Sequence, residues 1–79
     1  MAEQIEIAPG ITASTDISAG KPVIKGTRIS IDLVMDQLAA GASYEEVEDS
    51  LGITREDILA VLNYAAEIIS QEVVVARAR

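Results

Sequence analysis

Apolar residues recur at helical spacing through most of the chain, and they alternate with polar residues only near the N-terminus. The stretch 43–62, SYEEVEDSLGITREDILAVL, predicts a short helix, a tight turn and a longer helix. Val47 and Leu51 form one apolar face, and Gly52 can take the positive φ that a tight corner needs. The same core is expected to include Ile53, Ile58 and Val61. Together these offsets predict a helix-turn-helix unit.

Polar residues mark where these two helices are expected to begin. Ser43 and Glu46 have the spacing of a capping box, in which each side chain bonds the other residue's backbone N–H. Thr54 and Asp57 repeat that spacing with a shorter acid. The sequence therefore predicts helix starts just after Ser43 and just after Thr54.

A further helix is predicted from residue 31 to about residue 40. Ser30 can cap its start, and Gly41 is a natural residue just beyond its end. The side chains expected on its buried face are Leu33, Val34, Met35 and Leu38.

The last helix is predicted to run well past Leu62 and to carry more apolar surface than three short helices can bury. Exposed apolar area of this kind usually marks a partner surface, and a symmetric homodimer is the simplest solution. The expected dimer interface is Leu62, Ala65, Ala66, Ile68 and Ile69. Residues 73–75, Val-Val-Val, are compatible with a last helical turn, an added strand or part of the dimer contact.

The sequence before the predicted helices contains weaker patterns that predict β-strands. The stretch KPVIKGTRI predicts a small hairpin with Gly26-Thr27 as a two-residue type II′ turn. Residues 5–7 and 11–14 are further strand candidates, separated by the turn dipeptide Pro9-Gly10.

The predicted fold class is therefore mainly α, with a three-helix helix-turn-helix core and a small N-terminal β-hairpin. We expect one domain over residues 1–79, since 79 residues suffice for one small core. Residues 11–30 form its hairpin region and residues 31–73 its helical core. Residues 1–10 and 74–79 are expected to be loose ends.

Composition excludes much chemistry. The chain lacks His and Cys, so Ser-His-Asp and Cys-His catalysis and the usual zinc sites cannot be built within it. We expect no enzyme activity, no metal, no cofactor and no small-molecule substrate. No apolar run reaches membrane-spanning length and no export signal is recognisable, so we expect no membrane association and a cytoplasmic location.

The net charge of −7 opposes general nucleic-acid binding, because phosphate contacts need Lys and Arg. One local exception is the basic cluster Lys21, Lys25 and Arg28, with no acid between residues 20 and 30. These cations could grip DNA phosphates or enter an acidic pocket on a partner protein. Alternatively, Arg28 forms a salt bridge with Asp32 or Asp36 and fixes the hairpin.

Two other sets of residues have both a functional and a structural interpretation. In a DNA reader, Thr54, Arg55 and Asn63 would lie near the groove, although these are also ordinary surface residues. At the C-terminus, Arg77 and Arg79 form either a tail that docks in an acidic site or a solvated end. The clustered acids at 32–36 and 45–49 are expected to be solvated faces.

The string Gly20 to Ile29, GKPVIKGTRI, followed by a helix and the turn at Thr54, resembles the domain-of-unknown-function family numbered 433. The resemblance spans roughly residues 11–69. It implies a homeodomain-like or winged-helix-like core and an antitoxin-like role beside a nuclease-like protein with a PIN-type fold. It attaches no catalytic activity. Family members typically have Cys-Gly-Gly before the Lys-Pro pair, where this chain has Ser18-Ala19-Gly20, and the upstream segment is longer here.

The resulting hypothesis is a non-enzymatic, antitoxin-like module that occludes a PIN-type partner and regulates its own gene by weak DNA binding. The competing hypotheses are a sequence-specific helix-turn-helix transcription regulator and a purely structural dimerising module.

Overall fold

The structure is a computed structural model that describes residues 4–14 and 20–77, with side chains described as far as residue 71. Three helices follow a small three-stranded antiparallel sheet. The elements are β1 (Ile5–Ala8), β2 (Ile11–Ala13), β3 (Val23–Ile24), α1 (Ile31–Ala39), α2 (Tyr44–Leu51) and α3 (Arg55–Arg77). The predicted mainly α fold with a small N-terminal β unit is confirmed.

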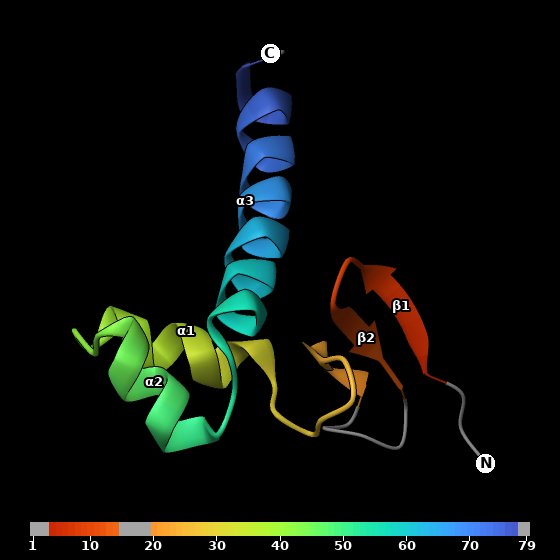
Figure 1. Cartoon of the computed structure of the whole chain (residues 1–79). Helices are drawn as coiled ribbons and strands as arrows, with labels where there is room; N and C mark the ends of the chain where they lie inside the picture. The colour runs from red at the N-terminus through yellow and green to blue at the C-terminus, as the bar shows by residue number, and fades with distance from the viewer. Residues whose placement is uncertain (1–3, 15–19, 78–79) are drawn as a thin grey trace.

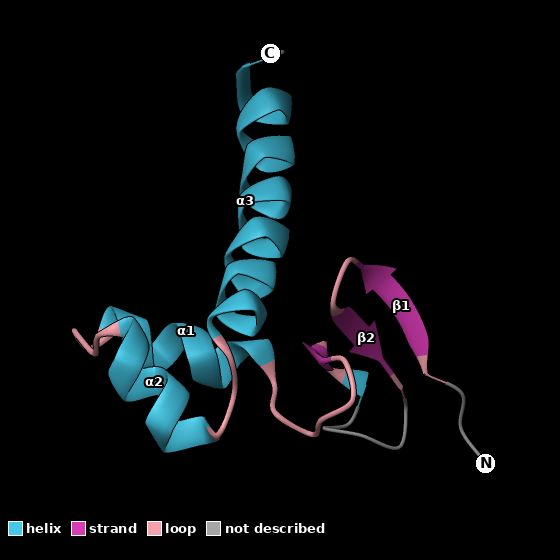
Figure 2. Ribbon diagram, in the orientation of Figure 1, coloured by secondary structure: helices cyan, strands magenta, loops and turns pink. Residues whose placement is uncertain are grey.

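Helix α3 is the axis of the molecule. Figure 1 shows α1 and α2 on one side of its base and the sheet on the other, while the upper part of α3 rises clear of both. The same view coloured by secondary structure separates the helical side from the strand side (Figure 2). Residues 73–75 belong to this helix rather than to a strand.

The sheet is built on a hairpin of β1 and β2 closed by Pro9-Gly10. Gly10 has a φ of 80°, which the tight turn requires. A bulge between Glu6 and Ala8 interrupts the ladder, and β3 then adds to the free edge of β2. Residues 5–8 are therefore a paired strand, which confirms the strand candidate at 5–7 and shows that the loose end expected up to residue 10 is wrong for this stretch.

The hairpin predicted at KPVIKGTRI is present in part, but its turn is wrong. After β3 (Val23–Ile24) the chain returns to form an antiparallel bridge between Val23 and Ser30, and Ile24 N–H donates to Ile29 O at 2.9 Å. Gly26, with a φ of 80°, is the third residue of the turn that Thr27 N–H closes on Ile24 O, and not the first central residue of a two-residue turn. The Thr27 hydroxyl donates to Ile24 O at 2.8 Å and accepts from Ile29 N–H at 3.0 Å. This side chain therefore stabilises the longer connection between the two paired segments.

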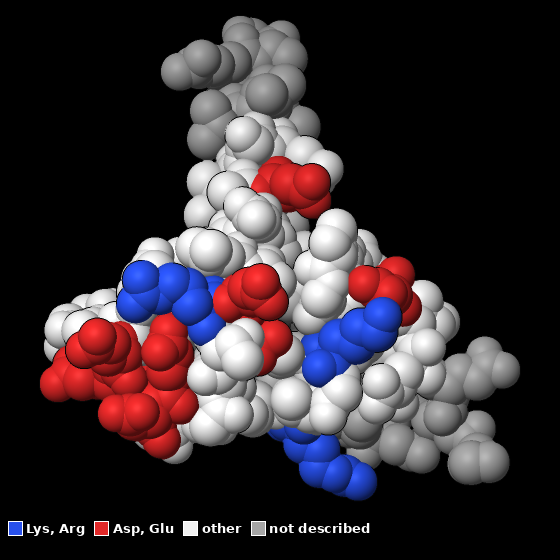
Figure 3. Space-filling model, viewed as in Figure 1, with Lys and Arg blue, Asp and Glu red and all other residues white. Residues whose placement is uncertain are grey.

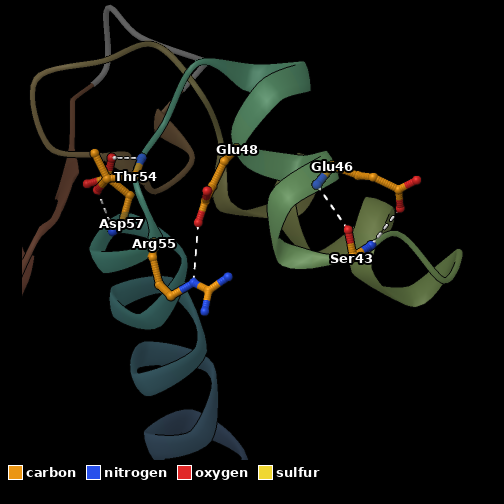
Figure 4. Close-up of polar contacts among 6 residues, drawn as sticks. All are labelled: Ser43, Glu46, Glu48, Thr54, Arg55 and Asp57. Atoms are coloured by element: carbon orange, nitrogen blue, oxygen red, sulfur yellow. Dashed lines mark hydrogen bonds and ion pairs between the residues drawn. The ribbon is translucent and has the colours of Figure 1, made fainter.

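Both predicted capping boxes are present, one at the start of α2 and one at the start of α3 (Figure 4). Ser43 Oγ accepts from Glu46 N–H at 3.1 Å, and Glu46 Oε1 accepts from Ser43 N–H at 2.7 Å. Thr54 and Asp57 make the same reciprocal pair at 3.1 and 3.0 Å. Gly52 ends α2 with a φ of 68°, so the corner forms where the sequence predicts it.

The core is aliphatic, and every element except β1 contributes a fully buried side chain, while Ala8 of β1 packs against the cluster from its edge. Its buried members are Ile11, Ile24, Ile31, Val34, Val47, Ile53, Ile58 and Val61. Tyr64 is the last residue of α3 that packs against this cluster. The first turns of α3 therefore anchor it, and its remaining turns project from the core.

Helix α1 packs Val34, Met35 and Leu38 against the core as predicted, but the prediction is wrong for Leu33 and missed Ile31. Leu33 is 41% exposed, whereas Ile31 and Val34 are buried. Ile31, Val34 and Leu38 follow the helical i, i+3, i+7 spacing, and Leu33 lies across the helix from Ile31. Ser30 is the N-cap residue, although its side chain makes no capping hydrogen bond.

Candidate functional site

The basic segment of residues 21–28 is held against the core by the strand inside it. Val23 and Ile24 are 0% and 1% exposed, and β3 pairs with β2. The three cations Lys21, Lys25 and Arg28 are all exposed on either side of that buried strand. A fixed backbone therefore presents three positive side chains to solvent.

Two of these cations take part in exposed ion pairs. Lys21 Nζ lies 3.4 Å from Asp32 Oδ2, and Lys25 Nζ lies 3.1 Å from Glu6 Oε1. The four side chains are 44–63% exposed, and pairs of this kind contribute at most about 1 kcal/mol each. A partner's carboxylates can therefore replace these contacts at little cost.

Arg28 has the third positive charge of the segment and is exposed. Among residues 4–14 and 20–71, it makes neither an ion pair nor a hydrogen bond through its side chain. The predicted alternative in which Arg28 bridges to Asp32 or Asp36 is wrong, because Asp32 is paired with Lys21 instead. With respect to the described residues, the guanidinium of Arg28 therefore keeps its donors for an external acceptor.

Glu6 is a site residue that sequence reasoning missed. Its Oε2 accepts from Gly10 N–H at 3.0 Å, and its Oε1 accepts from Lys25 Nζ at 3.1 Å. The Gly10 bond first, and then Lys25, lower the pKa of this carboxyl below its ordinary value. Glu6 and Lys25 are 19 residues apart, so no local spacing in the sequence signals their contact.

The predicted DNA-contacting residues are largely engaged within the chain. Arg55 Nε lies 3.3 Å from Glu48 Oε2, and its guanidinium carbon lies 5.0 Å from the centre of the Tyr44 ring. The Thr54 hydroxyl caps α3. Asn63 is exposed, so of the three it alone offers its side chain freely among the described residues.

The surface beside this corner is acidic. Figure 3 shows a continuous acidic patch over α2. It belongs to Glu45, Glu46, Glu48 and Asp49. A phosphate backbone docked against α2 and the start of α3 would meet these negative charges.

Of the predicted dimer residues, Leu62 packs against the core and the other four lie on the part of α3 beyond Tyr64. Leu62 and Ala65 are half-buried and Ala66 is exposed, whereas Ile68 and Ile69 are 39% and 55% exposed. A further exposed apolar residue, Leu59 at 44%, belongs to the same helix.

An open groove of about 830 Å³ lies between the β1–β2 turn and α3. Its polar lining comes from Glu56, Asn63, Tyr64, Glu67, Ser70 and Gln71, and its apolar lining from Ala8, Pro9, Leu59, Ala60 and Ala66. Within the described part of the chain, no group of three or more Asp and Glu residues is arranged to hold a metal ion.

The side chains of the C-terminal arginines lie outside the described part of the structure. Arg77 is the last residue of α3, its side chain lies outside the described residues, and Arg79 lies wholly outside them.

Among the described helices, none is both long and apolar enough to cross a membrane.

Comparison with known proteins identifies the family of this chain but not its activity. A family model described as "Protein of unknown function (DUF433)" matches residues 11–65, and the chain belongs to this family. The match covers β2, β3, α1, α2 and the part of α3 that contacts the core. A comparison with curated proteins finds no match.

A solved structure shares this arrangement. The crystal structure of Rv2018 from Mycobacterium tuberculosis is similar with a TM-score of 0.61 and 27% sequence identity, over 66% of this chain and 24% of that protein. This chain therefore spans about a quarter of the length of that protein.

Proposed function

We propose that this protein is a non-enzymatic, antitoxin-like binding module that acts in the cytoplasm. Its basic segment, Lys21, Lys25 and Arg28, inserts into an acidic site on a nuclease-like partner with a PIN-type fold. Binding there occludes the partner's site. The C-terminal residues Arg77 and Arg79 form a second cationic element of this proposal.

The observation that carries the proposal is the exposed Arg28 guanidinium, which makes no ion pair among the described residues. An arginine fork matches a carboxylate with two parallel hydrogen bonds, so a carboxylate cluster is a suitable acceptor. Lys21 and Lys25 flank Arg28 in exposed pairs that a stronger acceptor can replace. The buried strand β3 fixes the loop before binding, which lowers the entropy lost on docking.

Co-expression with the product of the adjacent gene tests this proposal. We expect a stable complex and rescue of growth when that gene product is toxic. The absence of both a complex and rescue would exclude the antitoxin-like role. A matched pair of arginine variants, described in the Discussion, then locates the contact surface.

The competing function is a helix-turn-helix transcription regulator. It is supported by the tight corner between α2 and α3 and by the exposed Asn63. The acids of α2 and the engagement of Arg55 with Glu48 weigh against tight DNA binding. A gel shift with upstream DNA at low salt separates the two, because phosphate contacts are strongest there. A specific shift without any protein partner would favour the regulator.

A further inference from the structure

Four apolar residues of α3, of which Leu62 is half-buried and the other three are exposed, follow a regular spacing that differs from its core face. Leu59, Leu62, Ala66 and Ile69 are separated by three, four and three positions, and we call them the α3 seam. Alternation of three and four positions is the repeat of two helices packed side by side. Leu59 and Ile69 are 44% and 55% exposed, so the ends of the seam lie open to solvent.

Apart from Leu62, which is half-buried and packs against the core cluster, the seam lies outside the protein core. The core residues of α3 are Ile58 and Val61, both 0% exposed, and each residue turns the helix by about 100°. The seam therefore lies beside the core face and continues up the helix after the core contacts end. Figure 1 shows no other element against this upper part.

We propose that the α3 seam is covered by the α3 seam of a second copy of this chain. A two-fold contact requires a surface that is complementary to itself, and a 3-4 apolar row meets that requirement. Asn63 and Ser70, which adjoin the seam, are uncharged. The groove beside the seam is lined by Leu59 and Ala66 and also by the acids Glu56 and Glu67, which are not themselves members of the seam.

The charge distribution favours a second copy over a charged partner. The chain has a net charge of −7, so self-association is favourable only where a surface brings no acids together. None of the four seam residues is charged, so the seam itself brings no acid into a two-fold contact. From Leu59 to the end of α3 the helix is about 28 Å long, and Val73 and Ala76 continue the spacing in the sequence. This length gives nearly three heptads of contact.

Sedimentation equilibrium of the full chain, over a range of concentrations, tests this inference with two matched variants. Ile69→Glu places a charge in the seam, whereas Gln71→Glu places the same charge two residues later on a different face, where Gln71 lines the groove. Both residues are exposed and lie beyond the core contacts, so both variants should fold. Far-UV circular dichroism and urea unfolding are the controls that show whether both variants fold.

We expect a wild-type dimer, a dimer for Gln71→Glu, and a dissociation constant raised at least about 100-fold for Ile69→Glu, because each dimer buries two such charges. Leu59→Glu, in the well-anchored first turns, should act as Ile69→Glu does. A monomeric wild type, or equal behaviour of Ile69→Glu and Gln71→Glu, would overturn the inference. Partner binding through Arg28 is a separate contact, so either proposal can fail alone.

Discussion

A Cβ placed on Gly10 would lie 3.0 Å from the Cβ of Ala60. The turn of the β1–β2 hairpin therefore approaches α3 so closely that no side chain fits between them. Gly10 also has a φ of 80°, a conformation that residues with a side chain rarely adopt. This contact joins the sheet side of the molecule to its helical axis and sets the closed end of the groove.

We predict that Gly10→Ala destabilises the protein by more than Gly26→Ala does. Both positions have a φ of 80°, but a Cβ at Gly26 would meet nothing within 4 Å. Gly26→Ala should cost about 1–2 kcal/mol of unfolding free energy from backbone strain alone. Gly10→Ala adds the steric contact with Ala60. Urea unfolding measures both, and equal losses would show that the hairpin does not press against α3.

The hydrogen bonds of Glu6 should make stability depend on pH. Its pKa is lower in the folded protein than the ordinary 4.5, chiefly because it accepts from Gly10 N–H and also because it pairs with Lys25. The folded state thus binds this proton less readily than the unfolded state does. Its stabilising contribution is full above the ordinary pKa and is lost as pH falls through the lower folded value.

Glu6→Gln tests this linkage. We expect the variant to be less stable than wild type at pH 7, and the difference to shrink as the pH is lowered from about 5 towards 3. Urea midpoints measured across that range provide the comparison. A difference that stays constant with pH would mean that the Glu6 carboxylate contributes nothing through its charge.

The two capping boxes, one at the start of α2 and one at the start of α3, should contribute separately to stability. We expect Ser43→Ala and Thr54→Ala each to lower the unfolding free energy by about 1 kcal/mol, because each leaves a backbone N–H without its partner. Thermal melts should fall by about 4–8 °C per kcal/mol for a domain of this size. If neither melt changes, water must replace these hydroxyls without cost.

Local features of the fold were predictable from the sequence because their causes are local. Glycine at position 52 and the i, i+3 pairs at Ser43 and Thr54 each act within one turn of helix. The helical spacing of Ile58 and Val61 likewise places both in the core, where the structure has them. The family resemblance drawn on GKPVIKGTRI also agrees with the family to which the chain belongs.

Features that depend on distant contacts could not be predicted in this way. The turn after β3 differs because the Thr27 hydroxyl stabilises a longer connection, which strand spacing alone does not signal. Lys21 rather than Arg28 reaches Asp32, and Glu6 finds Lys25 across the sheet. Leu33 is wrongly predicted to be buried. A leucine next to the buried face of a helix is expected to be buried as long as the orientation of the helix is unknown.

The central claim, that Arg28 is the main contact to an acidic partner, is tested most directly by isothermal titration calorimetry with the product of the adjacent gene. Arg28→Ala and Arg55→Ala each remove one exposed positive charge, but Arg55 is already paired with Glu48. The account predicts that Arg28→Ala weakens binding by at least about 30-fold, since it leaves the partner's carboxylate without its ion pair, and that Arg55→Ala changes it little. Equal effects of the two substitutions, or unchanged affinity for Arg28→Ala, would contradict it.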